Sequence, residues 1–164
     1  MYRETRIQAE DRNAFYAALT EQMEALLADE TDWIANLANA AGLLFYQLED
    51  VNWVGFYLNR NQELVLGPYQ GKPACTRIPF GTGVCGTAAE RRESQIVEDV
   101  HAFPGHIACD EASRSELVIP MERDGQVLGV LDIDSPVLAR FDPQDEKALR
   151  TIMRTIIKKS DFSF

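Results

Sequence analysis

The chain has 164 residues, of which 46% are hydrophobic and 26% charged, and its formal net charge is −10. This length and composition predict one globular domain spanning 1–164 and exclude an intrinsically disordered chain. Because an acidic surface repels phosphate groups, nucleic acid and anionic membranes are excluded as expected partners.

The cysteines and the absence of targeting signals point to a reducing compartment. No apolar segment approaches the ~20 residues of a membrane-spanning helix, and residues 1–12 lack the apolar core of a secretion signal. We therefore expect a cytoplasmic protein. The cysteines Cys75, Cys85 and Cys109 are odd in number and widely spaced, which does not fit a disulfide framework. Taken singly, each is either an inert buried thiol or a reactive one.

Helical periodicity dominates the first third of the chain. A first helix is expected over 12–28, with an inner stripe of Phe15, Leu19, Met23 and Leu26. Thr31 is a candidate N-cap for a second helix. The inner stripe of this second helix is expected to contain Trp33, Ile34, Leu37, Ala38, Phe45 and Leu48.

The period then changes to two, which indicates strands. Residues 52–58 and 63–70 are expected to form a hairpin, with its turn at 59–62. A short strand over 76–79 is followed by a helix over 84–92, for which Thr82 is the expected cap. Another brief strand is expected at 95–97.

The last third of the chain predicts a long loop, a hairpin and a helix. Residues 99–114 are rich in His, Pro, Gly and Asp and are expected to form an ordered loop. Strands over 116–122 and 126–134 are joined by a turn at 123–125. Asp142 and Pro143 are typical of a helix start. The predicted fold is α+β, with a central antiparallel sheet and the N- and C-terminal helices packed on one face.

Acidic side chains interrupt the two late strands on one face. Leu131 and Ile133 alternate with Asp132 and Asp134. In the preceding strand, Glu116 and Leu117 point to opposite faces of the sheet. Adjacent carboxylates repel one another, so this face needs either water or a cation. One interpretation is therefore a solvated outer face.

The other interpretation is a pocket for a small ammonium compound. If Trp53 and Tyr57 share the acidic face, aromatic rings and carboxylates line the same cavity. Cys109 lies seven residues before Glu116, and Cys85 stands in the first turn of its helix, where the helix dipole favours thiolate. Cys75 lies between the first hairpin and that helix.

A zinc site is a third interpretation, which the spacing disfavours. Its ligands would come from Cys75, Cys85, His101, His106 and Cys109. No closely spaced cysteine pair is present, and the two histidines are equally consistent with ordinary loop residues. We therefore expect no metal.

Several segments together resemble a known family. They are NWVGFYL at 52–58, LVLGPYQGKPAC at 64–75, GTGVCGTA at 81–88, GHIACDEASRSELVIP at 105–120 and GVLDIDSP at 129–136. This pattern is similar to the free methionine-R-sulfoxide reductases, which have a GAF fold. The resemblance implies a homodimer that reduces free methionine-R-sulfoxide and that thioredoxin recycles, with no bound cofactor.

The resemblance also implies unequal roles for the site residues. Cys109 corresponds to the nucleophile, Cys75 to the main resolving cysteine and Cys85 to an auxiliary cysteine. The family's substrate-binding carboxylates correspond to Glu116, Asp132 and Asp134, and its aromatic wall corresponds to Trp53 and Tyr57. A non-catalytic GAF sensor for an amino compound is the alternative, although a sensor does not require three thiols. No role is assigned to residues 1–12.

Glu116 is also the expected proton donor on chemical grounds. Thiolate attack on a sulfoxide sulfur needs the oxygen protonated, because oxide is a poor leaving group, and a carboxyl group on an apolar strand has a raised pKa. The resulting sulfenic acid would condense with a second thiol to form a disulfide. That step requires one cysteine-bearing loop to move.

Overall fold

The computed structural model describes residues 5–106 and 110–163. Within these residues, a six-stranded antiparallel sheet has the strand order β3-β2-β1-β6-β5-β4. The helices are α1 (Arg12–Leu26), α2 (Trp33–Gln47), α3 (Gly83–Arg91) and α4 (Pro143–Lys159), with a 3-10 turn η1 (Val100–Ala102). The strands are β1 (Trp53–Asn59), β2 (Glu63–Gln70), β3 (Arg77–Pro79), β4 (Gln95–Val97), β5 (Ser115–Arg123) and β6 (Gln126–Ser135).

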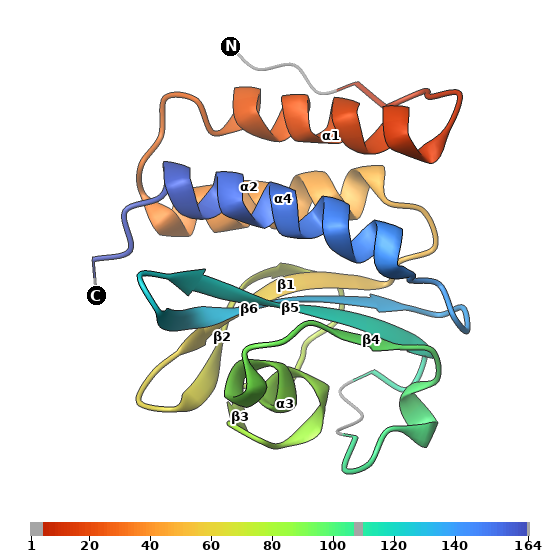
Figure 1. Cartoon of the computed structure of the whole chain (residues 1–164), viewed down its shortest axis with the longest axis vertical. Helices are drawn as coiled ribbons and strands as arrows, with labels where there is room; N and C mark the ends of the chain where they lie inside the picture. Colours follow the sequence, from red (N-terminus) through yellow and green to blue (C-terminus); the bar gives the residue numbers. More distant parts are fainter. Residues whose placement is uncertain (1–4, 107–109, 164) are drawn as a thin grey trace.

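The elements form layers on the two sides of the sheet (Figure 1). Helices α2 and α4 lie on one face, and α1 covers them on the outside. Helix α3 lies on the opposite face. The predicted α+β fold with terminal helices on one face is therefore confirmed.

Acidic N-caps begin three of the helices. Asp11 accepts a hydrogen bond from the Ala14 amide and starts α1. Asp32 caps α2 through the Ala35 amide, so the prediction that Thr31 is the cap was wrong by one residue. Asp142 forms a capping box with Asp145 at the start of α4, as the Asp-Pro pair predicted.

The inner faces of α1 and α2 differ from their predicted stripes. In α1, Tyr16, Leu19 and Met23 are buried, whereas Phe15 and Leu26 are only partly buried.

In α2, Leu37 and Leu44 are buried together with Ala40 and Ala41, and the C-cap residue Leu48 is buried as well. Ile34, Ala38 and Phe45 are exposed, contrary to the prediction. The alanines let α2 pack close to its neighbours, and a pattern built on the larger side chains missed them.

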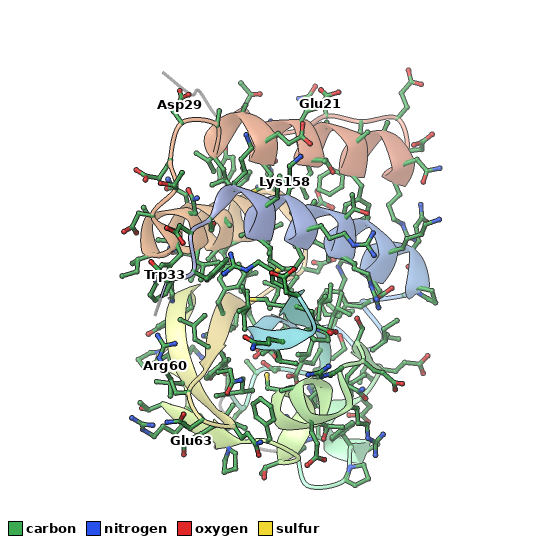
Figure 2. The ribbon with its side chains drawn as sticks, turned by 60° about the vertical axis from the view of Figure 1, so that its left-hand side comes forward. Glu21, Asp29, Trp33, Arg60, Glu63 and Lys158 are labelled. Atoms are coloured by element: carbon green, nitrogen blue, oxygen red, sulfur yellow. The ribbon has the colours of Figure 1, made fainter. Side chains whose placement is uncertain are left out.

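Two hairpins carry the central strands. The β1–β2 turn is closed by paired backbone bonds, in which the Arg60 amide donates to the Glu63 carbonyl at 2.8 Å and the Glu63 amide donates to the Arg60 carbonyl at 3.2 Å. Figure 2 shows this turn, with Arg60 and Glu63 labelled, far from the helical layers that carry Glu21 and Lys158.

The sheet has an apolar cluster on each face. Val54, Phe56 and Leu131 join the cluster beneath the helices, where Leu44 and Ile152 meet them. The opposite cluster contains Trp53, Tyr57 and Val130 of the sheet together with Val84 and Cys85 of α3. Strand alternation therefore sends one set of side chains to the helical core and the other toward α3. Among the described residues, no helix is long and apolar enough to cross a membrane.

Candidate active site

Strand register brings the predicted carboxyl groups together on the α3 side of the sheet. Glu116 of β5 pairs with Asp134 of β6, and Val118 pairs with Asp132. Glu116 and Asp132 are each only 6% exposed, so the solvated-face interpretation was wrong for this pair. Within the described chain, Asp132 Oδ1 is buried without a hydrogen-bond partner. This arrangement leaves a buried acceptor facing the site.

An aromatic wall stands beside these carboxyl groups. Trp53 pairs with Asp134 across the β1–β6 ladder, which places its ring on the acidic face. Its ring stacks on Tyr57 and Tyr69, with centroids 5.9 Å and 5.2 Å away. Gly55 lies between these rings, and an added Cβ there would come within 2.3 Å of the Tyr69 Cβ. The expected association of Trp53 and Tyr57 with the acidic face is thus present.

Two of the three cysteines belong to the described part of the site. Cys85 is a buried free thiol that lies 3.8 Å from Glu116 Oε1 and donates to it. Its sulfur and the carboxyl oxygens of Glu116 and Asp132 all lie within 4.8 Å of one another. Cys75 is disulfide-bonded, and its carbonyl accepts a hydrogen bond from the Tyr57 hydroxyl at 3.0 Å. Cys109, the predicted nucleophile, lies outside the described residues.

The site contains two small adjoining cavities. The first, of about 30 Å³, is lined by Tyr57, Thr82, Cys85, His106, Glu116 and Asp132, among others. The second, of about 20 Å³, lies between Trp53, Tyr57, Pro73 and the carboxyl groups of Asp110, Asp132 and Asp134. Each has room for about one water molecule. The disulfide-bonded form is therefore nearly closed.

Comparison with known proteins identifies the family. The GAF domain model matches residues 22–157. The free methionine-R-sulfoxide reductase of Escherichia coli is 53% identical over 148 residues, covering 90% of each chain. The protein of the same name from Saccharomyces cerevisiae is 45% identical over 147 residues, covering 85% of this chain and 82% of its own. The chain belongs to the free methionine-R-sulfoxide reductase family.

The fold of the site agrees with this assignment. The free methionine-R-sulfoxide reductase of Neisseria meningitidis, solved with its substrate, superposes with a TM-score of 0.92 at 47% identity. That comparison covers 97% of this chain and 95% of the other. This member of the reductase family is an oxidoreductase.

Burial dominates the electrostatics of the reductase site. Desolvation raises the pKa of Glu116 well above its ordinary value, and the charges of Asp132 and Asp134 add to the effect. Desolvation likewise raises the pKa of Asp134, and it raises that of Asp132 to about 6. Asp132 is thus the most readily ionised of the three, and Glu116 holds its proton to a higher pH than an exposed glutamate does.

Cys85 does not behave as its helical position predicted. Burial raises the pKa of its thiol well above the ordinary value, and the charges of Asp132, Glu116 and Asp134 raise it further. These effects outweigh the attraction of the α3 dipole, so the expected thiolate is not favoured. Thr82 does occupy the N-cap position of α3, but its hydroxyl forms no capping bond.

Among the residues that the structure describes, the cysteines and histidines considered as zinc ligands do not form one cluster. Cys75 is disulfide-bonded, and Cys85 is surrounded by carboxyl groups rather than histidines. The rings of His101 and His106 lie together, with centroids 6.3 Å apart. Burial lowers the pKa of His106, which keeps this ring neutral beside the cavity.

Sequence reasoning missed several polar residues around the cavities. Asn52, Lys72, Asp110 and Ser113 form a connected group at the mouth of the site. Tyr69 was also missed as the outer ring of the aromatic wall. A bulge between β1 and β2 places it opposite Gly55, and strand alternation alone does not reveal such a shift in register.

Proposed function

We propose that this protein reduces free L-methionine-(R)-S-oxide to L-methionine. The observation that carries the proposal is a group of three carboxyl groups beside stacked aromatic rings, at a site that contains a disulfide-bonded cysteine. Two of these carboxyl groups are buried and that of Asp134 is half-buried. Family membership supports the same reaction, because relatives of high identity carry this activity in their names.

The pocket chemistry suits a free amino acid. Asp132 and Asp134 would receive the α-ammonium group, which would stabilise their ionised forms and lower their pKa values. The apolar tail with its sulfoxide would lie against Trp53 and Tyr57. A methionine within a peptide has no α-ammonium group, so its binding would leave buried carboxylates unpaired. This difference accounts for selection of the free amino acid.

Reduction would begin with thiolate attack on the sulfoxide. The Cys109 sulfur bonds to the substrate sulfur while Glu116 donates a proton to the sulfoxide oxygen. The substrate S–O bond breaks as this oxygen passes as hydroxyl to the Cys109 sulfur, the bond between the two sulfurs breaks, and methionine leaves. The substrate sulfur is thus reduced by two electrons and the cysteine sulfur is oxidised to a sulfenic acid.

The enzyme would then form a disulfide. The Cys75 thiolate attacks the Cys109 sulfur, the S–O bond breaks, and hydroxide leaves as water after protonation. The disulfide-bonded state of Cys75 and the free thiol of Cys85 support Cys75 as the resolving cysteine. Cys85, with its raised pKa, would serve as an auxiliary thiol.

Recycling and assembly complete the proposal. Thioredoxin would reduce the disulfide as an external partner in the cytoplasm, so the protein would need no bound cofactor. The functional unit would be a homodimer, as in the family that the sequence resembles. Light scattering of the purified protein tests the dimer, and coupling to NADPH oxidation through thioredoxin and its reductase tests the reductant.

One experiment tests the reaction itself. Wild-type protein is incubated with racemic free methionine sulfoxide and dithiothreitol, and methionine and the remaining epimers are separated by chromatography. We expect consumption of the R epimer alone. Cys109→Ser should bind substrate without turnover. Binding by the wild type with no methionine formed would replace the reductase by the amino-compound sensor.

A further inference from the structure

A polar network joins two connections that each carry a cysteine. Asn52 Nδ2, just before β1, donates to Asp110 Oδ2 and to Ser113 Oγ, both at 3.2 Å. The ammonium group of Lys72 lies 3.6 Å from Asp110 Oδ1. Lys72 precedes Cys75 by three residues, and Asp110 directly follows Cys109. The network therefore ties the 71–76 connection to the 110–113 segment.

The carboxylate of Asp110 is already used by protein groups. Its Oδ1 accepts from the Ala112 amide at 2.9 Å in addition to its contact with Lys72, and its Oδ2 accepts from Asn52. The Ala112 hydrogen bond lowers the pKa of Asp110, which keeps it ionised at neutral pH. Asp132, by contrast, has an oxygen that lacks a partner among the described residues. Asp110 is thus equipped to hold protein segments, whereas Asp132 is equipped to receive a ligand.

Both ends of the network are fixed to the central sheet. The Asn52 amide donates to the Asp134 carbonyl at 2.9 Å, next to the β1–β6 ladder. The indole of Trp53 donates to the Lys72 carbonyl at 3.1 Å. Asp110 itself is only 10% exposed, although Lys72 is 72% exposed. The Asn52 donor next to the start of β1 and the exposed Lys72 cation both contact the Asp110 carboxylate, and together they set where the 110–113 segment sits.

We propose that Asp110 is a positioning residue for disulfide formation, held by Asn52 and Lys72 so that the two cysteine-bearing connections meet. This inference rests on the proposed function and concerns its second step. In that step the Cys75 sulfur bonds to the Cys109 sulfur and displaces hydroxide from the sulfenic acid. Holding the two segments together raises the rate of this step by proximity.

Single-turnover kinetics of the reduced enzyme separate the two steps. Methionine release reports the first step, and trapping of sulfenic acid with dimedone reports the lifetime of the intermediate. In Asp110→Asn, the amide cannot accept from both Asn52 and Ala112 as the carboxylate does. We expect the sulfenic acid to persist about tenfold longer, a larger change than any in the rate of methionine release.

A matched variant controls for a general effect on this part of the chain. Asp99 caps η1 through the His101 amide and is not a member of the network, so Asp99→Asn should leave both rates unchanged. Circular dichroism checks that each variant is folded. A normal sulfenic-acid lifetime in folded Asp110→Asn, with normal methionine release, would overturn the inference and leave the proposed function intact.

Lys72 provides a second test that does not threaten folding, because its side chain is exposed. Lys72→Met should slow disulfide formation about threefold, and Lys72→Arg should restore it. Added salt should slow the same step in the wild type and have little effect in Lys72→Met, since an exposed ion pair is screened. Equal salt sensitivity in both proteins would contradict the role of this ion pair.

Discussion

At the Glu116 carboxyl group, burial and neighbouring carboxylates act in the same direction. Removing water disfavours the ionised form, and Asp132 and Asp134 repel a further negative charge. Glu116 directly precedes the apolar run 117–121 of β5 and is 6% exposed, so it can hold a proton at a pH where an exposed glutamate is ionised. The same burial keeps the Cys85 thiol protonated, which fits the proposed roles of Glu116 as proton donor and of Cys85 as auxiliary thiol.

The role of Glu116 can be tested by an isosteric change. Glu116→Gln should lower the rate of methionine formation by about a hundredfold, because the sulfoxide oxygen loses its acid, while substrate binding is largely retained. Single-turnover release of methionine measures the rate, and calorimetry with reduced protein measures binding. Glu122→Gln changes an exposed glutamate on the same strand and should be silent. A fully active Glu116→Gln enzyme would remove Glu116 from the chemical step.

The raised pKa of Asp132 should make the stability of the protein depend on pH. Its pKa is 3.8 ordinarily and about 6 in the folded protein. Between these two pH values the folded state therefore binds more protons than the unfolded state does. The contribution of Asp132 to stability is therefore most favourable below pH 3.8, and it is lost as the pH rises through about 6. Over this window the wild type should lose up to about 3 kcal/mol more than Asp132→Asn. Urea unfolding at several pH values measures the difference, and parallel curves for the two proteins would contradict it.

At the scale of elements, strand alternation allowed the site to be anticipated from sequence. The alternation of Asp132 and Asp134 with Leu131 and Ile133 fixes which face is apolar, and the β1–β6 register then brings Trp53 to that acidic face. Alternation does not reveal bulges, which is why Tyr69 was missed. Helix faces were less predictable, because Ala40 and Ala41 fill the interface where Ile34 and Phe45 were expected.

Replacing a glycine by alanine should have opposite effects on stability in β1 and in α2. Gly55→Ala places a Cβ within 2.3 Å of the Tyr69 Cβ and 2.5 Å of the Trp53 ring, so the ring stack must move. We expect a loss of about 1–3 kcal/mol in stability, with weaker substrate binding. Gly42→Ala in α2 meets nothing within 4 Å and should stabilise the protein by up to about 1 kcal/mol through helix propensity. Chemical denaturation of both variants checks the contrast, and equal effects would refute it.

At the scale of the whole molecule, local patterns account for the layers of the fold but not for the polar network. The α+β order, the sheet with helices on one face and the acidic pocket face follow from periodicity and capping residues. Asn52 and Asp110 are 58 positions apart, and nothing in either local pattern predicts that their side chains bond. Long-range polar contacts of this kind depend on how loops fold back over the sheet.

The redox state of the chain should control access to the pocket. In the disulfide-bonded form the two cavities measure about 30 Å³ and 20 Å³. A cavity of about 150 Å³ is needed to hold even benzene, and methionine sulfoxide is larger. Binding should therefore require reduction of the disulfide and movement of a cysteine-bearing connection. Calorimetry should detect methionine sulfoxide binding to the reduced protein and none to the oxidised protein.

The Cys75→Ser variant distinguishes the effect of the disulfide on substrate binding from any other effect of the oxidant. This variant cannot form the Cys75 disulfide, so it should bind substrate after treatment with oxidised dithiothreitol as well as before. Equal binding to the reduced and oxidised wild-type protein would show that the closed cavities open without reduction. The pocket would then be gated by loop fluctuation, and the disulfide would serve turnover alone.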